Sequence, residues 1–254
     1  MSATKINAIM QHYETLAEND AYDWIRWKDG RTRFSKKVAN RFFIGVMLDQ
    51  GQKAERAWNA AEYLVDNYFN TSEDFWGDIA TTHLARIKKI CQTGYEGKSF
   101  ALNYSFNKFP RNLKSSAKLM IEKYGSDPRN IWNVRAENVY QIYDRFLLFP
   151  GIGDALAKMA QFALVKNHGV AGGISSKSEM SIKPDILVRR VLRRVGLVSS
   201  GQTNVVVAQA REFGLSSPAD FDAAVWVIGR EYCFKSVPAC NKCPIALACD
   251  SASV

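Results

Sequence analysis

Four of the five cysteines of this 254-residue chain lie in the stretch CFKSVPACNKCPIALAC, from Cys233 to Cys249. Their spacing is C-x6-C-x2-C-x5-C, so only Cys240 and Cys243 form the short knuckle that structural zinc sites usually contain twice. The longer arms suit a loop wrapped around a bulkier group, and four thiolates also hold a four-iron cluster. The spacing favours a [4Fe–4S] cluster on Cys233, Cys240, Cys243 and Cys249, with a single zinc ion as the alternative.

Two disulfides would be another explanation for clustered cysteines. The N-terminal stretch MSATKINAIMQHYETL lacks the apolar core of a secretory signal. No segment approaches the ~18 consecutive apolar residues that a membrane span needs. We therefore expect a cytoplasmic protein with no signal peptide or transmembrane segment, in which thiols stay reduced and bind metal. Cys91 has no partner nearby in the sequence, and we interpret it as an ordinary buried cysteine.

The charge of the chain favours a polyanionic partner. Lys and Arg number 34 against 25 Asp and Glu, which gives a net charge of +9. Nucleic acid is the leading candidate and an acidic membrane surface the second. The hydrophobic content of 47% is that of a globular protein, and the length suits one large domain or two small ones.

Apolar residues recur at helical spacing wherever the pattern can be judged. The predicted helices with an apolar face include 53–69, 139–147, 187–195 and 216–232, the last with Ser217 as its cap and Pro218 in its first turn. No segment alternates apolar and polar residues as a strand would. The Gly- and Ser-rich stretch 167–182 is interpreted as a loop. The predicted fold class is all-α.

A glycine-rich turn separates two predicted helices in FLLFPGIGDALAKMAQFAL (146–164). Gly151, Ile152 and Gly153 form the turn, and the two glycines allow the backbone to approach a partner closely. The amides that open the second helix form an anion-binding site, so the hairpin suits a DNA phosphate. The alternative is a plain turn between helices.

An acidic residue precedes an arginine-rich helix in IKPDILVRRVLRRVGLV (182–198). Asp185 stands at the helix start behind Pro184, where capping is its simplest role. The arginines lie largely off the Leu and Val stripe, and Arg189 and Arg193 are candidate contacts to the DNA backbone. The alternative is a solvated helix face.

These elements occur together, in this order, in one known superfamily. The hairpin FPGIGDALA, the helix PDILVRRVLRRVGL and the tail WVIGREYCFKSVPACNKCPIALAC resemble the helix-hairpin-helix DNA glycosylases. Within them, the chain is similar to the iron–sulfur branch that includes endonuclease III and the mismatch adenine glycosylases. An upstream segment, FIGVMLDQGQKAERAW (43–58), resembles the one that carries the family's base-displacing glutamine.

The resemblance implies two helical lobes with a DNA-binding cleft between them. One lobe would be a multi-helix barrel that carries the hairpin (37–167). The other would join 1–36 to 168–254 and hold the [4Fe–4S] cluster. The implied partner is double-stranded DNA with a damaged, modified or mismatched base, and we expect a monomer that meets this DNA in the nucleoid.

The family flips a base out of the duplex and hydrolyses its N-glycosidic bond. A carboxylate stabilises the oxocarbenium-like sugar, and the matching residue here is Asp185. Members that also cut the strand use a lysine two residues past the second hairpin glycine, where this chain has Ala155. The resemblance therefore implies a monofunctional glycosylase. The alternatives are a glycosylase/lyase with a relocated amine such as Lys158, and a non-catalytic DNA-binding protein.

Three further features concern the base and its pocket. Gly45 stands where adenine-removing members carry a glutamate, so adenine excision by that route is not expected. Gln50 matches the glutamine that fills the gap left by the flipped nucleotide, and an exposed helix-end glutamine is the alternative. Asp49 is interpreted as surface or as a second polar group of the pocket. The aromatic set YDWIRW (22–27) is core or includes a base-stacking residue. The sequence does not identify the base removed or the base opposite it.

Overall fold

The structure is a computed structural model of the chain, and it describes residues 2–18, 34–69, 74–100, 108–132, 139–167 and 180–253. In these ranges the chain is helical, and the only β-type pairing is an isolated bridge between Tyr95 and Lys98. The all-α fold class is therefore confirmed. The aromatic set at 22–27 and most of the predicted loop at 167–182 lie outside the described residues.

The chain divides into two compact units. Unit 1 contains residues Met1–Tyr22 and Gly173–Val254, and unit 2 contains Asp23–Gly172. The helices of unit 2 are α2 (Lys36–Leu48), α3 (Ala54–Asn67), α4 (Phe75–Thr81), α5 (Leu84–Thr93), α6 (Lys108–Tyr124), α7 (Arg129–Trp132), α8 (Val139–Leu147), α9 (Asp154–Phe162) and the π-helical turn η2 (Ala163–Asn167). Those of unit 1 are α1 (Ser2–Glu18), α11 (Ile186–Val195), α12 (Thr203–Arg211), α13 (Pro218–Glu231) and the 3-10 turns η3 (Cys240–Lys242) and η4 (Ala246–Ala248).

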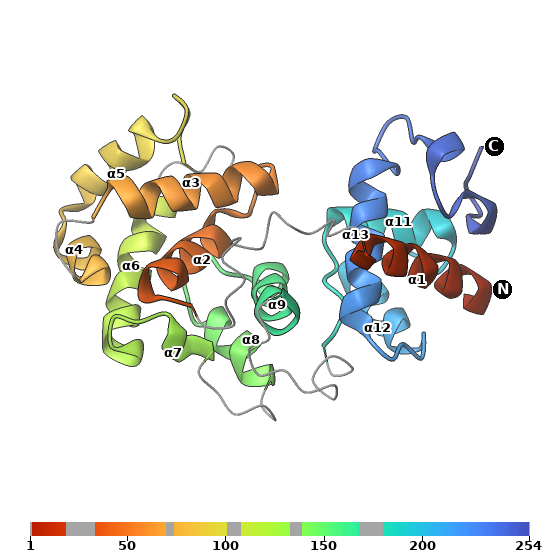
Figure 1. Cartoon of the computed structure of the whole chain (residues 1–254), viewed down its shortest axis with the longest axis horizontal. Coiled ribbons are helices and arrows are strands. Elements are labelled where there is room, and N and C mark those ends of the chain that lie inside the picture. Colours follow the sequence, from red (N-terminus) through yellow and green to blue (C-terminus); the bar gives the residue numbers. More distant parts are fainter. Residues whose placement is uncertain are drawn as a thin grey trace. The chain divides into compact units, whose positions relative to one another are not determined.

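Helix α2 forms the centre of unit 2, and α3 and α9 pack against it (Figure 1). All its residues from Phe42 to Leu48 are buried, as in a helix that is covered on every side. The aromatic core extends from α2 to the start of the hairpin, because the rings of Phe43 and Phe149 lie 4.6 Å apart. The turn that follows Phe149 is thereby anchored to the core of the unit.

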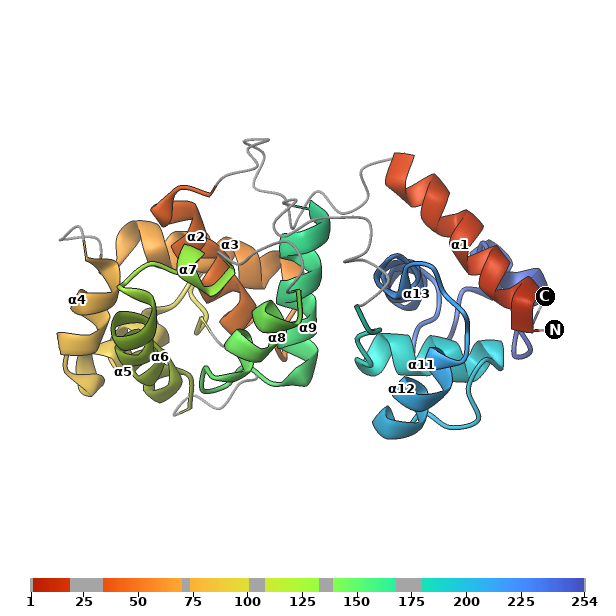
Figure 2. The same cartoon turned by 90° about the horizontal axis from the view of Figure 1, so that it is seen from below.

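In unit 1, α13 lies between α1 and α11 (Figure 2). The predicted apolar stripe of α11 faces this core, where Val188, Val191, Leu192 and Val195 are buried. Helix α13 begins as predicted, since the Ser217 hydroxyl accepts the Asp220 N–H at 3.4 Å and Pro218 occupies the first turn. The position of Asp185 is therefore set by a helix with a well-packed apolar face.

The predicted apolar face of α8 is only partly correct. Ile142 and Phe146 are buried, but Leu147 is 39% exposed because the helix ends there and the chain turns towards the hairpin. None of the helices in the described part of the chain is both long and apolar enough to cross a membrane.

Candidate active site and nucleic-acid interface

Asp185 is the N-cap residue of α11. Its backbone is extended (φ −73°, ψ 178°), and its Oδ1 accepts the N–H groups of Leu187 at 2.8 Å and Val188 at 2.9 Å. These two bonds satisfy amides that the helix itself leaves unpaired. They also fix the orientation of the carboxylate, whose side chain is still 21% exposed. The capping role predicted for Asp185 is present, and it leaves Oδ2 directed away from the helix amides.

Lys183 is the functional candidate that the sequence reasoning missed. Its Nζ lies 3.1 Å from Oδ2 of Asp185, and its backbone N–H donates to Oδ1 of the buried Asp222 on α13 at 2.7 Å. The ammonium also lies 5.8 Å from the centroid of the Trp226 ring. The signal in the sequence was the spacing K-P-D. The Asp185 N–H donates to the Lys183 carbonyl at 2.8 Å, which closes a tight turn around Pro184 and keeps the two residues close together.

The hairpin between α8 and α9 turns at Gly151, whose φ of 90° is strained for any residue with a Cβ. Gly153 has an ordinary extended φ of −97°, and a Cβ placed there would meet no atom within 4 Å. No contact within the described part of the protein therefore requires a glycine at position 153. No described side chain caps α9, so its first-turn amides have no such acceptor.

Ile152, between the two glycines, is turned inwards. Its side chain is buried, and its N–H donates to the carbonyl of Phe149 at 3.0 Å. Ile152 thus anchors the hairpin to the core of unit 2. Any contact that it makes with a ligand outside the protein would come through its carbonyl rather than through its side chain or N–H.

Gln50 lies beside this hairpin, although 101 residues separate it from Gly151. Its Nε2 donates to the carbonyl of Met47 at 2.8 Å and to that of Gly151 at 3.3 Å. Gln50 is half-buried rather than an exposed helix-end residue. The fold of unit 2 therefore brings together two features that the sequence analysis assigned separately to DNA binding.

Lys158, the amine that the sequence analysis named as an alternative nucleophile, is held in an ion pair on α9. Its Nζ pairs with Oδ1 of Asp154 at 3.0 Å, and its side chain is only 12% exposed. The Tyr143 hydroxyl donates to the same oxygen at 2.8 Å. Burial, together with this carboxylate, raises the pKa of Tyr143 to about 12, so the hydroxyl keeps its proton at neutral pH. These contacts hold the Lys158 side chain along its own helix, next to the small side chain of Ala155.

Gly45 is in close contact with a core tryptophan. A Cβ at Gly45 would lie only 2.3 Å from the ring of Trp58, which is buried. A glutamate at this position would need the space that the indole fills, and it would place a charge in an apolar core. The missing glutamate is thus matched by a packing contact that requires glycine.

The arginines of α11 divide between two roles. Arg190 Nε donates to the Cys233 carbonyl at 2.7 Å and its Nη2 to the Gly229 carbonyl at 2.9 Å. Arg194 donates to the carbonyls of Phe234 at 2.6 Å and Lys235 at 2.9 Å. These two arginines therefore hold the cysteine-rich loop and do not form one stripe with Arg189 and Arg193.

The other two arginines face away from that loop. Arg193 is exposed. Arg189 is half-buried, and it donates to the Asp185 carbonyl and to the Gly201 carbonyl, each at 3.3 Å. Of the four arginines of α11, only Arg193 is exposed, and the contacts of Arg189 and Arg193 with an external anion stay a prediction.

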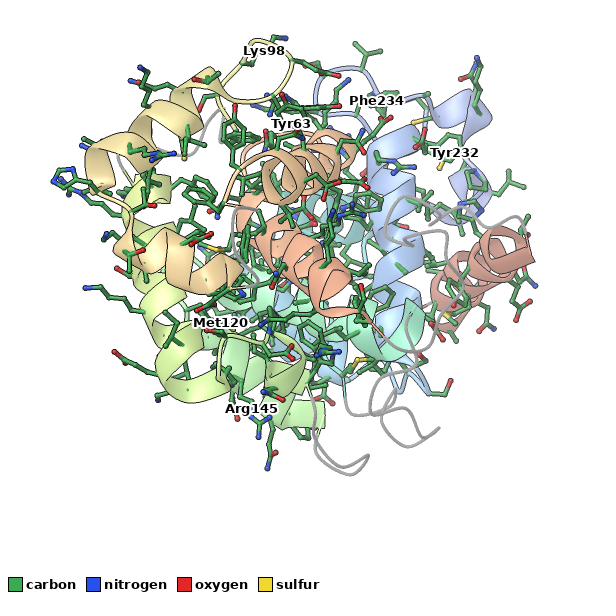
Figure 3. All side chains as sticks on the ribbon, turned by 60° about the vertical axis from the view of Figure 1, so that its left-hand side comes forward. Tyr63, Lys98, Met120, Arg145, Tyr232 and Phe234 are labelled. Carbon is green, nitrogen blue, oxygen red and sulfur yellow. The ribbon has the colours of Figure 1, made fainter. Side chains whose placement is uncertain are left out.

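The four clustered cysteines line a common cavity of about 140 Å³, together with Arg194, Val195 and Ile228. The sulfur atoms near the end of α13 lie close to Tyr232 and Phe234 (Figure 3). Arg194 contacts two of the thiols, since Nη1 lies 3.4 Å from Cys233 Sγ and Cys249 Sγ lies 3.5 Å from the Arg194 carbonyl oxygen.

Two of the four thiols lie in surroundings that disfavour the negatively charged thiolate form. Burial, followed by the negative charge of neighbouring thiolates, raises the pKa of Cys243 and of Cys249 above its ordinary value. Among the described residues, no group of three or more His, Cys, Asp or Glu side chains is arranged to hold a single metal ion. The four thiols nevertheless line the same cavity.

No protein-family model matches the sequence. No curated protein matches it at a significant level either. The similarity that exists is structural. A non-covalent endonuclease III–DNA complex superimposes with a TM-score of 0.58 at 16% sequence identity, and it covers 83% of this chain and 82% of that one.

Two further structures extend this similarity over nearly the whole chain. A trapped endonuclease III–DNA covalent intermediate has a TM-score of 0.59 at 15% identity and covers 96% of both chains. A thermostable thymine-DNA glycosylase has a TM-score of 0.57 at 16% identity and covers 99% of this chain and 96% of that one. The protein therefore has the all-α fold shared by endonuclease III and this thymine-DNA glycosylase, the superfamily fold that its motifs resemble.

Proposed function

We propose that the protein is a DNA glycosylase that removes a damaged, modified or mismatched base from double-stranded DNA. The observation that carries this proposal is Asp185. It matches the catalytic aspartate of the family, and its carboxylate is oriented by two helix amides while remaining accessible. The endonuclease III fold supports the proposal, because the similar solved structures include a glycosylase and two complexes with DNA.

In the proposed reaction the bond between the base and C1′ of the flipped nucleotide breaks, and the base leaves with the electron pair. The sugar becomes oxocarbenium-like, and Oδ2 of Asp185 stabilises its positive charge. Water then adds to C1′ and releases a proton, which balances the proton taken up by the base. Oδ1 is already engaged by the amides of Leu187 and Val188, so Oδ2, which also contacts the Lys183 ammonium, is the oxygen proposed to approach the sugar.

We propose that excision is hydrolytic and that no protein amine displaces the base. Ala155 has no nucleophile at the position of the lyase lysine. Lys158 is paired with Asp154 and largely buried, which supports the same conclusion. Gly45 lies against Trp58, so the general acid of the adenine-removing enzymes has no counterpart at this position.

We also propose that Cys233, Cys240, Cys243 and Cys249 hold a [4Fe–4S] cluster. A single zinc ion needs its sulfur ligands at about 2.3 Å from one point. The four thiols line one cavity, and their C-x6-C-x2-C-x5-C spacing, which has a single short knuckle, favours a four-iron cluster over zinc. The Arg194 guanidinium beside Cys233 compensates part of the negative charge of bound thiolates. When bound, the cluster would cross-link the loop and would take no part in the hydrolysis.

DNA binding is proposed to use the hairpin, Gln50, Arg189 and Arg193. The uncapped amides at the start of α9 supply donors for a phosphate, and Gly153 leaves open space for it to approach. Gln50, held beside Gly151, is proposed to fill the gap left by the flipped nucleotide. Each arginine would neutralise one phosphate and release its counterions.

The two kinds of arginine should respond differently to substitution. We expect Arg193→Gln, like Arg189→Gln, to lower the slope of log K against log salt concentration by about 0.9, the value for one phosphate contact. Arg190→Gln should leave the slope unchanged and lower the thermal unfolding midpoint, because it removes hydrogen bonds to the cysteine loop. Fluorescence anisotropy at several salt concentrations measures the slopes. An unchanged slope for Arg193→Gln would show that Arg193 contacts solvent and no DNA phosphate.

The proposed function is tested with duplexes that each carry one modified or mismatched base. We expect one or more of these bases to be released, which appears as strand cleavage after alkali treatment of the resulting abasic site. Strand cleavage without alkali should be slower than base release. A protein that binds these duplexes and releases no base from any of them would instead be a non-catalytic DNA-binding protein.

A further inference from the structure

We propose that Lys183 forms a Schiff base with the abasic sugar that base excision leaves behind. The observation behind this assignment is the contact of 3.1 Å between Lys183 Nζ and Asp185 Oδ2. The inference rests on the proposed function, because it places the sugar of the damaged nucleotide at Asp185. It adds a covalent step with a residue outside the hairpin, where the family's lyase lysine is replaced by Ala155.

Both the backbone and the side chain of Lys183 are held by neighbouring residues. Its backbone N–H donates to Asp222 at 2.7 Å, and its carbonyl accepts the Asp185 N–H at 2.8 Å. Its ammonium is held by Asp185 and faces the ring of Trp226. A catalytic amine with these supports is preorganised, since it loses little conformational freedom when the sugar arrives.

The geometry of Asp185 directs the sugar towards this amine. Oδ1 accepts two helix amides, so Oδ2 is the oxygen available to the anomeric carbon. The Lys183 amine and the anomeric carbon would thus be neighbours of the same oxygen, because Nζ lies 3.1 Å from Oδ2. Attack requires a separation of about 3–3.5 Å between the reacting atoms, and the rotatable bonds of the lysine side chain allow this approach. Lys183 is 19% exposed and is therefore accessible to a bound substrate.

The ion pair determines when the amine can react. As an ammonium beside Asp185, Lys183 has no lone pair and does not displace the base. After base release, the ring-opened sugar presents an aldehyde at C1′. Lys183 then gives one proton to Asp185 and adds through its nitrogen lone pair to C1′, which forms a carbinolamine. The hydroxyl of the carbinolamine leaves as water with the proton from Asp185.

This sequence is balanced in atoms and charge. The ammonium and the aldehyde give an iminium and one water molecule, and the Asp185 carboxylate is regenerated. No oxidant or reductant is involved, and hydrolysis of the iminium returns the free lysine. Excision by water and Schiff-base formation are thus consecutive steps at one carboxylate, and the second does not accelerate the first.

The test uses a duplex with a preformed abasic site and sodium cyanoborohydride, which reduces an iminium to a stable amine. We expect the wild-type protein to form a covalent protein–DNA adduct, and mass spectrometry to locate it on Lys183. Lys183→Arg should reduce the yield at least tenfold, because a guanidinium keeps the positive charge opposite Asp185 but does not form the iminium. Lys158→Arg, the matched control, should give the wild-type yield.

The alternative outcomes separate this inference from the proposed function. An adduct that persists in Lys183→Arg, an adduct lost in Lys158→Arg, or the absence of any adduct would overturn the assignment of Lys183. Because the abasic site is supplied, trapping does not require excision by this protein. If the protein releases bases but is not trapped, only the proposed Schiff base at Lys183 is wrong. If it is trapped at Lys183 but releases no base, only the proposed glycosylase activity is wrong.

Discussion

Replacing Asp185 with asparagine should lower the rate of base excision by about 10²- to 10³-fold, the usual cost of losing a preorganised electrostatic group at a transition state. Asparagine has the shape of aspartate and ranks beside it as a helix N-cap, so α11 should keep its structure. What is lost is the negative charge that faces the sugar cation. Single-turnover excision measures the rate, and anisotropy with an uncleavable substrate analogue measures affinity, which should change little.

Asp74→Asn is the matched control for this experiment. Asp74 is the N-cap of α4 in unit 2, where its Oδ1 accepts the Gly77 N–H at 3.0 Å. The substitution makes the same chemical change at a helix start and should leave the excision rate as it is. If Asp185→Asn excises at the wild-type rate, or if both variants lose activity equally, Asp185 is only a capping residue.

Removing one clustered thiol should release the metal and unfold the C-terminal loop. Protein prepared anaerobically is expected to contain about four iron atoms per chain, and Cys243→Ala should contain almost none. Apart from its hydrogen bonds to Arg190 and Arg194, the loop has little apolar support, since Ile245 is the one buried residue among the described residues 233–253. We expect its amides to exchange rapidly with solvent and the thermal unfolding midpoint of the variant to fall, because a segment with so small a core depends on its cross-link.

Cys91→Ala provides the control for metal binding. Cys91 is buried on α5 in unit 2, and burial raises its pKa to about 12, so it stays a neutral thiol. Its replacement should leave the iron content unchanged. One zinc ion per chain with no iron in the anaerobic protein would contradict the cluster, and equal iron in wild type and Cys243→Ala would exclude that cysteine as a ligand.

The local features of this protein could be predicted from its sequence. The apolar spacing of α11 predicted its buried face, except that Leu187 at its start is only half-buried, and Ser217 with Pro218 predicted the start of α13. The cap at Asp185 was also predicted from Pro184 and the helix pattern that follows. These predictions succeed because helix periodicity and capping depend on residues within a few positions of one another.

The tertiary structure decided the partners of the long and the polar side chains. Four arginines of one helix look alike in sequence, yet Arg190 and Arg194 bind carbonyls 39–43 residues away, and only the packing of α11 on α13 brings those carbonyls near. The contact of Gln50 with Gly151 arises in the same way.

Lys183 illustrates the physical reason most clearly. Its spacing from Asp185 was visible in the sequence, but a lysine side chain has many rotamers, and local propensity does not choose among them. Its ammonium lies 3.1 Å from Asp185 and 5.8 Å from the centre of the Trp226 ring, and Asp222 holds its backbone N–H. Asp222 and Trp226 come from α13, about 40 residues further along the chain. Local periodicity thus predicted the helices and the capping aspartate, whereas long-range packing selected the carbonyls that Arg190, Arg194 and Gln50 reach.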